Sequence, residues 1–199
     1  MDALDIVKAI LNIYGPLLSF IRICFVVTGL VITGTALFDL VQASSPQQKF
    51  FGHGMKEPTT GGALLKILIG GAFASLGYDG YIIGALGSSL FGGNGIELVT
   101  VQSYLPNAGA NDLGAYIVTA VVGFTQLVGI IAVARGLYGF VEKIDAQGNA
   151  TYRKAWVLII TGVLCVYVQD VHDVFVNTFG TQIGGTFFTI FLNNLLKIG

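Results

Sequence analysis

The sequence carries little charge for its length. Only 11% of its 199 residues are Asp, Glu, Lys or Arg, while 54% are hydrophobic. Soluble globular domains carry about 25% charged residues, because much of their surface faces water. The scarcity of charge argues against a soluble enzyme and a disordered tail, and the absence of a basic patch argues against direct nucleic-acid binding. The composition predicts an integral membrane protein.

Residues that commonly carry chemistry are also scarce. The two cysteines, Cys24 and Cys165, lie inside apolar runs, where we expect packing residues and not a disulfide. His172 lies between Asp170 and Asp173, but neighbours in a helix point in different directions, so a polar helix cap is favoured over a metal site. The sequence contains no Ser-His-Asp arrangement, phosphate-binding loop or CxxC motif. We therefore expect no catalytic, cofactor-binding or metal-binding residues.

Long apolar runs are present instead. A membrane-crossing helix needs about 20 apolar residues. Four runs qualify as candidates, at about 23–41, 61–76, 113–133 and 155–168. Two Gly-rich apolar segments follow polar breaks, at about 81–91 and 174–196. The predicted fold is an all-α polytopic membrane protein with about four transmembrane helices in two tandem hairpins and two accessory segments. Five spans are the main alternative.

The N-terminal segment is predicted to be an amphipathic helix. Residues 3–14 place apolar side chains near one helical face, with Lys8 opposite, and Pro16 follows. The sequence opens with Asp2 and Asp5, unlike the basic start of a cleavable signal peptide. We expect an interfacial helix that ends before Pro16.

Lys and Arg are absent from one long loop, and their distribution predicts how the chain is oriented across the membrane. Residues 92–112 contain neither, whereas the loops 43–60 and 142–154 are basic. Because basic loops remain on the cytoplasmic side, these two loops are predicted to be cytoplasmic. The N-terminus and loop 92–112 then lie on the outer side.

Six charged residues lie near the ends of the predicted spans. Charges at membrane depth are costly, so they commonly form ion pairs or serve a function. At the outer ends we expect Arg22 to face Asp79 or Asp170, and at the inner ends Asp39 to face Lys66 or Arg135. An ion or proton path is the functional alternative, although no acidic residue lies near the centre of a span.

Glycine is abundant, with 28 residues. Two GxxxG spacings predict close helix packing, at Gly80–Gly84 and Gly180–Gly184. Residues 61–95 and 161–195 also align weakly at an offset of 100. Within a single membrane domain, 1–199, this indicates a parallel tandem repeat of about 16–95 and 114–195. Coincidence of a Gly-rich composition is the alternative to the repeat, and a pore-lining stripe is the alternative to glycine packing.

The whole-chain layout resembles the small inner-membrane proteins of type IVB secretion and conjugation systems, the IcmC/DotE group and its TraQ-like relatives. The resemblance rests on the length near 200, the amphipathic start LDIVKAILNIYGPLLSFIRICF, the stretch GGALLKILIGGAFASLGYDGYIIGALGSSLFGG and the basic hairpin TYRKAWVLIITGVLCVYVQDVHDVF. It implies a non-enzymatic subunit of a translocation apparatus in the bacterial inner membrane, with the outer side facing the periplasm.

The resemblance also implies partners. We expect other membrane subunits as homo- or hetero-oligomeric partners, together with lipid, and a periplasmic partner at loop 92–112 and the C-terminal segment. A small transporter or ion channel is the second hypothesis, and a pilin-like filament subunit is the third.

Overall fold

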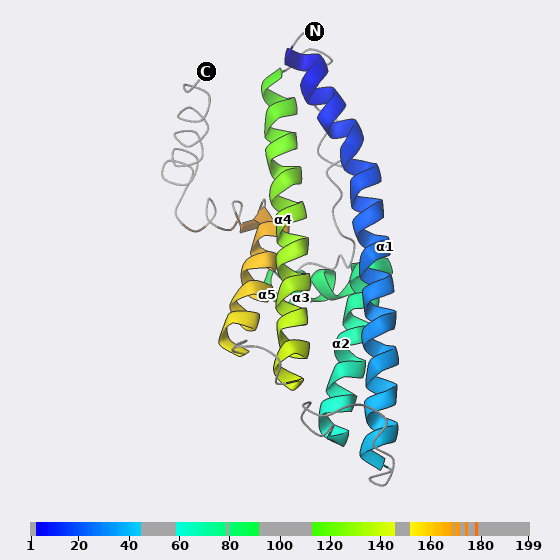
Figure 1. Ribbon diagram of the computed structural model, residues 1–199. Helices are drawn as coiled ribbons and strands as arrows, with labels where there is room; N and C mark the ends of the chain where they lie inside the picture. Colours follow the sequence, from blue (N-terminus) through cyan, green and yellow to red (C-terminus); the bar gives the residue numbers. More distant parts are fainter. Residues whose placement is uncertain are drawn as a thin grey trace. The chain divides into compact units, whose positions relative to one another are not determined.

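The computed structural model describes residues 3–44, 59–78, 80–91, 113–145, 152–168, 170, 171, 174 and 178. The chain divides into two compact units, residues 1–166 and 167–199. The first unit contains five helices: α1 (Ala3–Ser44), α2 (Thr60–Tyr78), α3 (Tyr81–Phe91), α4 (Leu113–Ile144) and α5 (Tyr152–Val166) (Figure 1). In the second unit, Thr178 Oγ1 donates a hydrogen bond of 2.7 Å to the Val174 carbonyl, four residues earlier as in a helix. The described residues form no strand, so the all-α prediction is confirmed for them.

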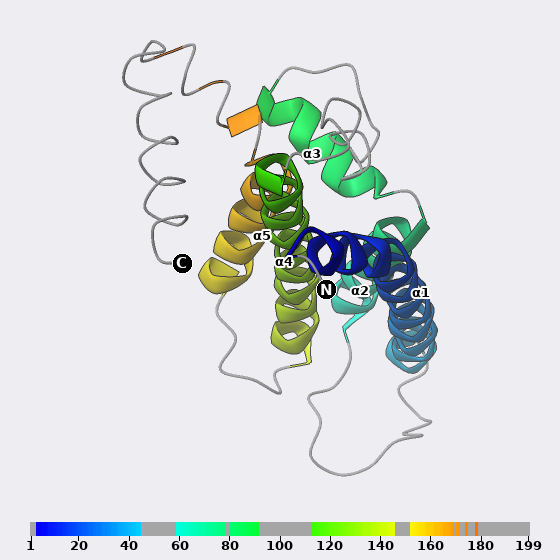
Figure 2. The ribbon, with the colours of Figure 1, turned by 90° about the horizontal axis from the view of Figure 1, so that it is seen from above.

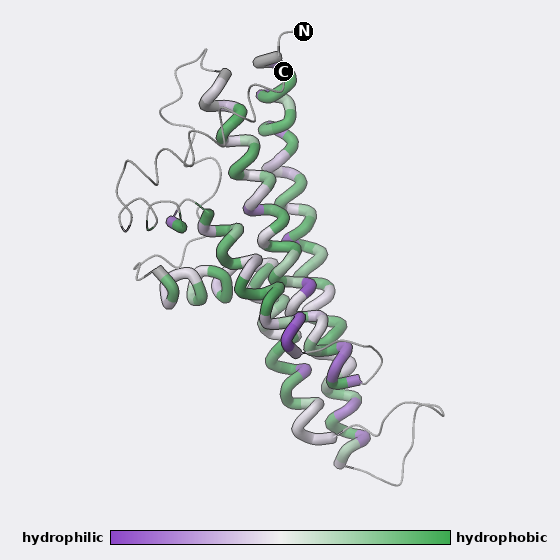
Figure 3. Tube along the Cα trace, turned by 90° about the vertical axis from the view of Figure 1, so that its left-hand side faces the viewer, coloured by the Kyte–Doolittle hydropathy of each residue, from purple (hydrophilic) through white to green (hydrophobic). Residues whose placement is uncertain are grey.

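Three helices in the described part of the chain are long and apolar enough to cross a membrane. They cover Asp5–Ser44, Thr60–Tyr78 and Tyr116–Ile144. Hydrophobic residues occupy most of the length of the helices (Figure 3). The fourth predicted span, 155–168, coincides with α5, whose 15 residues reach roughly 22 Å, less than the roughly 30 Å of a bilayer core. Three apolar helices are compatible with a membrane protein, and a fourth span stays a prediction.

The predicted helix boundary before Pro16 is wrong. α1 is one helix of 42 residues with Pro16 inside it. A proline removes one backbone hydrogen bond, but membrane helices tolerate this where the rest of the helix is retained. No polar break separates residues 3–14 from the apolar run that follows, and the two form one continuous helix.

The break between α2 and α3 lies at Gly80. Its φ of 63° is in the left-handed region that favours glycine. Its N–H donates a hydrogen bond of 3.0 Å to the Ser75 carbonyl near the end of α2, a contact typical of a helix C-terminus. α3 then runs across the direction of α2 (Figures 1 and 2). Its bounds match the predicted accessory segment 81–91, and its 11 residues are too few to cross a bilayer.

The long helices pack as two pairs. α1 lies against α2, and α4 lies against α5 (Figure 2). α4 also contacts α1 and α2, and α3 contacts α2 and α5. α1 and α4 run in the same direction, as do α2 and α5 (Figure 1).

Candidate functional site

The helices of the first pair, α1 and α2, come closest where Gly29 meets Gly70, and we call this point the glycine crossing of the pair. A Cβ added at Gly29 of α1 would lie 2.6 Å from the Gly70 carbonyl oxygen and from the Ala74 nitrogen of α2. A Cβ added at Gly70 would lie 2.9 Å from the Gly29 oxygen and from the Thr33 nitrogen. These are backbone atoms, which cannot rotate away. The two helices therefore touch backbone to backbone, as small residues allow in membrane proteins.

The second pair repeats this crossing. A Cβ added at Gly129 of α4 would lie 2.6 Å from the Gly162 oxygen and 2.9 Å from the Val166 nitrogen of α5. A Cβ added at Gly162 would lie 2.6 Å from the Gly129 oxygen and 2.8 Å from the Val133 nitrogen. In both pairs, each glycine faces the carbonyl oxygen of the other glycine and the backbone nitrogen four residues further along that helix.

The two crossings define which residues correspond. Gly29 and Thr33 of α1 correspond to Gly129 and Val133 of α4, an offset of 100, whereas Gly70 and Ala74 of α2 correspond to Gly162 and Val166 of α5, an offset of 92. The connection from α4 to α5 is eight residues shorter than that from α1 to α2, which accounts for the change of offset.

The predicted alignment of 61–95 with 161–195 therefore has the wrong register for the second helix of each pair. It matched Gly62 with Gly162, whereas the crossing matches Gly70 with Gly162. The signal that could have found the geometric correspondence was present. With a gap of eight residues, Gly29 aligns with Gly129, Ala63 with Ala155 and Gly70 with Gly162.

The predicted GxxxG glycines have other positions. Gly84 is buried within α3, but Gly80 lies in the turn before that helix. The spacing Gly80–Gly84 is therefore not a packing stripe of one helix. Gly180 and Gly184 lie outside the described residues. The crossing glycines were not predicted, because glycine is frequent throughout the chain and the alignment without a gap does not match Gly70 with Gly162.

An ion cluster joins three helix ends. Lys66 of α2 is buried, and its Nζ lies 2.5 Å from Asp39 Oδ2 of α1. The same Nζ forms an ion pair with Asp145, directly after α4. Asp39 with Lys66 was one of the two pairings expected at this end. Asp145 was missed, because the predicted run ended at residue 133 whereas α4 continues to Ile144.

The remaining predicted ion-pair residues are Arg22, Asp79, Arg135 and Asp170. Arg135 lies 3.2 Å from Glu142 Oε1 on its own helix, not beside Asp39. Glu142 is seven residues, or two turns, further along α4, so this pairing is local. Asp79 lies outside the described residues, and Arg22 and Asp170 belong to different units. The expected outer pairing of Arg22 stays a prediction.

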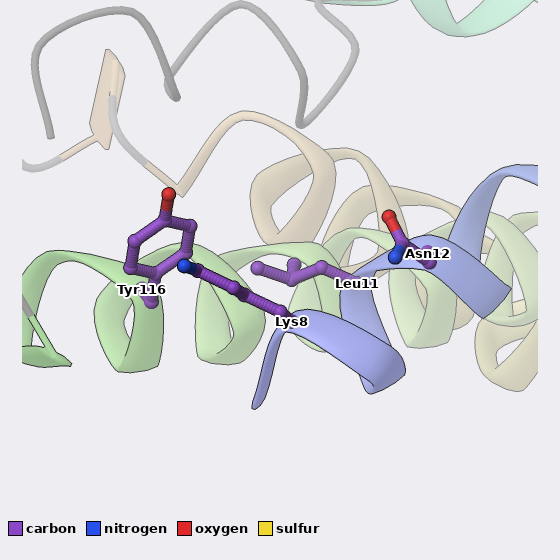
Figure 4. A pocket seen from close by; sticks show the side chains of 4 residues that line it. All are labelled: Lys8, Leu11, Asn12 and Tyr116. Atoms are coloured by element: carbon purple, nitrogen blue, oxygen red, sulfur yellow. The ribbon is translucent and has the colours of Figure 1, made fainter. Parts of the chain in front are cut away.

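A small hollow lies between the N-terminal ends of α1 and α4. Lys8, Leu11 and Asn12 of α1 and Tyr116 of α4 line it, and its volume is about 300 Å³. Lys8 Nζ lies 5.3 Å from the centre of the Tyr116 ring (Figure 4), within the range of a cation–π contact. Such a contact offsets part of the cost of placing the Lys8 ammonium on an apolar helix.

Among the described residues, no group of three or more His, Cys, Asp or Glu side chains is placed to hold a metal ion. Comparison of the chain with protein-family models, with curated proteins and with solved structures found no match. The candidate functional features of this chain are therefore its glycine crossings, its ion cluster and its exposed apolar helix faces.

Proposed function

We propose that this chain is a non-enzymatic membrane subunit that packs against other membrane helices in a multi-subunit assembly. The proposal rests on the observation that the rest of the chain buries α1 much less than it buries α2 and α4. In the most apolar part of each helix, 17% of residues are buried in α1, against 39% in α2 and 44% in α4. Lipid can cover such a helix, but α1 also presents Gly34, where an added Cβ would meet no atom within 4 Å. Small residues on an apolar face allow close approach of a partner helix.

The assembly we propose is a type IVB secretion or conjugation apparatus of the bacterial inner membrane. The resemblance of the whole chain to the IcmC/DotE group supports this choice. In this orientation the ion cluster at Lys66 lies toward the cytoplasm, and the hollow at Lys8 lies toward the periplasm. The fourth span in this proposal is 155–168, which begins within α5.

Purification of the tagged chain from its native membranes tests the proposal. We expect mild detergent to co-purify further inner-membrane subunits, including a secretion ATPase, in fixed ratio. Gly34→Leu and Gly71→Leu fill open positions on α1 and α2, so they should reduce co-purification while the monomer keeps its helix content. Gly15→Leu is the matched control, because Gly15 is an open position of α1 that precedes the apolar run 23–41. Recovery of the chain without any secretion component would contradict the proposed assembly.

A further inference from the structure

The two helix pairs pack side by side in the same orientation. One face of α1 and one face of α5 remain uncovered. The correspondence between the pairs makes the faces comparable residue by residue. We define an α1 row and an α4 row at corresponding positions, about a quarter turn around each helix from the glycine crossing. The α1 row is Ile23, Leu30, Gly34 and Val41, and the α4 row is Gly123, Ile130, Ala134 and Val141.

The α4 row is buried and the α1 row is not. Ile130 is 6% exposed and its counterpart Leu30 is 64% exposed; Val141 is 8% exposed and its counterpart Val41 is 63% exposed. Apart from α5, α4 contacts α1 and α2. The α4 row is therefore covered by the first pair, while the same row on α1 has no such cover.

On the second helix of each pair the difference is reversed, because the row of the first pair is buried and that of the second pair is largely exposed. Lys66, Ile69 and Phe73 form a buried row on α2, and Lys66 reaches Asp145 after α4. The α2 row therefore reaches the second pair at Lys66, and Phe73 also packs edge to face on Phe25 of α1. The counterparts of the α2 row on α5 are Leu158, Thr161 and Cys165, of which the first two are exposed and the third is half-buried.

We propose that a second copy of this chain covers these faces, with the α1 row of one copy packed against the α5 row of the next. Within the chain, the α2 side of the first pair meets the α4 side of the second pair. The α5 row corresponds to the α2 row, and the α1 row corresponds to the α4 row. The two exposed rows are therefore the counterparts of the two surfaces that already meet. A contact between copies would thus continue the contact that already exists inside each copy.

This contact is head-to-tail, because different surfaces of the two copies meet. Such contacts close into rings when the rotation between copies permits and otherwise extend into filaments. Gly34 fits the proposal, since its counterpart Ala134 lies in the buried α4 row and an added Cβ at Gly34 would meet no atom. The proposal makes a second copy the partner helix at Gly34, and it does not rest on the secretion role proposed above.

Cysteine cross-linking in native membranes tests the proposal. Lys66 lies beside Asp145, so its counterpart Leu158 should lie near the Val41 end of the α1 row in the neighbouring copy. In a Cys24→Ser, Cys165→Ala background, one tagged chain carries Val41→Cys and a second, differently tagged chain carries Leu158→Cys. Co-expression and a short bismaleimide should give a dimer that contains both tags. Omission of either cysteine should abolish that dimer.

Gln42→Cys with Ile160→Cys is the matched control. Gln42 is half-buried and Ile160 is exposed. Helical spacing places each of them more than a quarter turn from the row on its own helix, so this combination should give little cross-linking. A Val41–Val41 dimer from the first chain alone would overturn the proposal in favour of a face-to-face contact. Cross-linking no greater than in the control would overturn it in favour of lipid or of residues 167–199 as the cover. Subunits of other proteins recovered in pull-down do not affect this readout.

Discussion

The α1–α2 pair and the α4–α5 pair are built on the same crossing but are covered differently. Gly29 meets Gly70 in the first, and Gly129 meets Gly162 in the second, at the same 2.6 Å from an added Cβ to the facing carbonyl oxygen. Outside the crossing, Val41 is exposed where Val141 is buried. The comparison teaches that contact within a pair follows from its own small residues, whereas burial outside the crossing depends on where the pair lies in the stack.

The pairs also differ in charge. Lys66 in the first pair corresponds to Leu158 in the second, and Asp39 corresponds to Gly139. The buried ammonium of Lys66 has one carboxylate from its own pair and one from the end of α4. Because the second pair lacks the lysine, the ion cluster is a link between the pairs and not a property that both of them share.

The largest expected effect comes from removal of this link. Lys66→Met leaves the Asp39 and Asp145 carboxylates, 25% and 30% exposed, without their shared cation. We expect the free energy of unfolding to fall by about 3 kcal/mol, the low end for a broken buried ion pair because both carboxylates reach some solvent. SDS titration followed by circular dichroism in lipid–detergent micelles measures it. The matched control Leu158→Met changes the counterpart position and should have little effect. Equal losses in the two variants would show that the cluster contributes no more to stability than the leucine at the corresponding position.

An intermediate effect is expected at the crossings. Gly29→Ala and Gly129→Ala each place a methyl group 2.6 Å from backbone atoms of the facing helix, so each should destabilise the protein by about 2 kcal/mol through overpacking. Gly34→Ala, where the added methyl meets no atom, is the control. The same unfolding titration compares the three variants. If only one of Gly29→Ala and Gly129→Ala destabilises the protein, the two crossings are not energetically equivalent.

The smallest effect is expected at corresponding valines. Val141→Ala removes buried methyl groups and should cost roughly 1 kcal/mol, whereas Val41→Ala removes exposed ones and should change the stability of the monomer little. Unfolding of both variants in micelles dilute enough to hold single chains measures the difference. Similar losses in the two variants would indicate that α1 is covered even in the monomer.

The sequence predicted those features that depend on neighbours along the chain. The segment 81–91 is α3, since a polar break and Gly80 mark its start. The apolar run 113–133 lies within α4, although the helix continues to Ile144. The helix boundary expected at Pro16 is wrong, because a proline is tolerated inside a long apolar helix. The predicted offset of 100 does not describe α2 and α5, because the two connections differ by eight residues, and the tandem repeat itself stays a prediction.

The scarcity of charge and the long apolar runs determined by themselves that this chain forms apolar helices compatible with a membrane. They also indicated that Asp39 and Lys66 lie at the same end of their helices. Only the tertiary structure decided which of the 28 glycines bring helices together, and that Asp145 completes the ion cluster. The physical reason is that apolar character is a property of each segment, whereas a crossing depends on which two backbones come within contact distance.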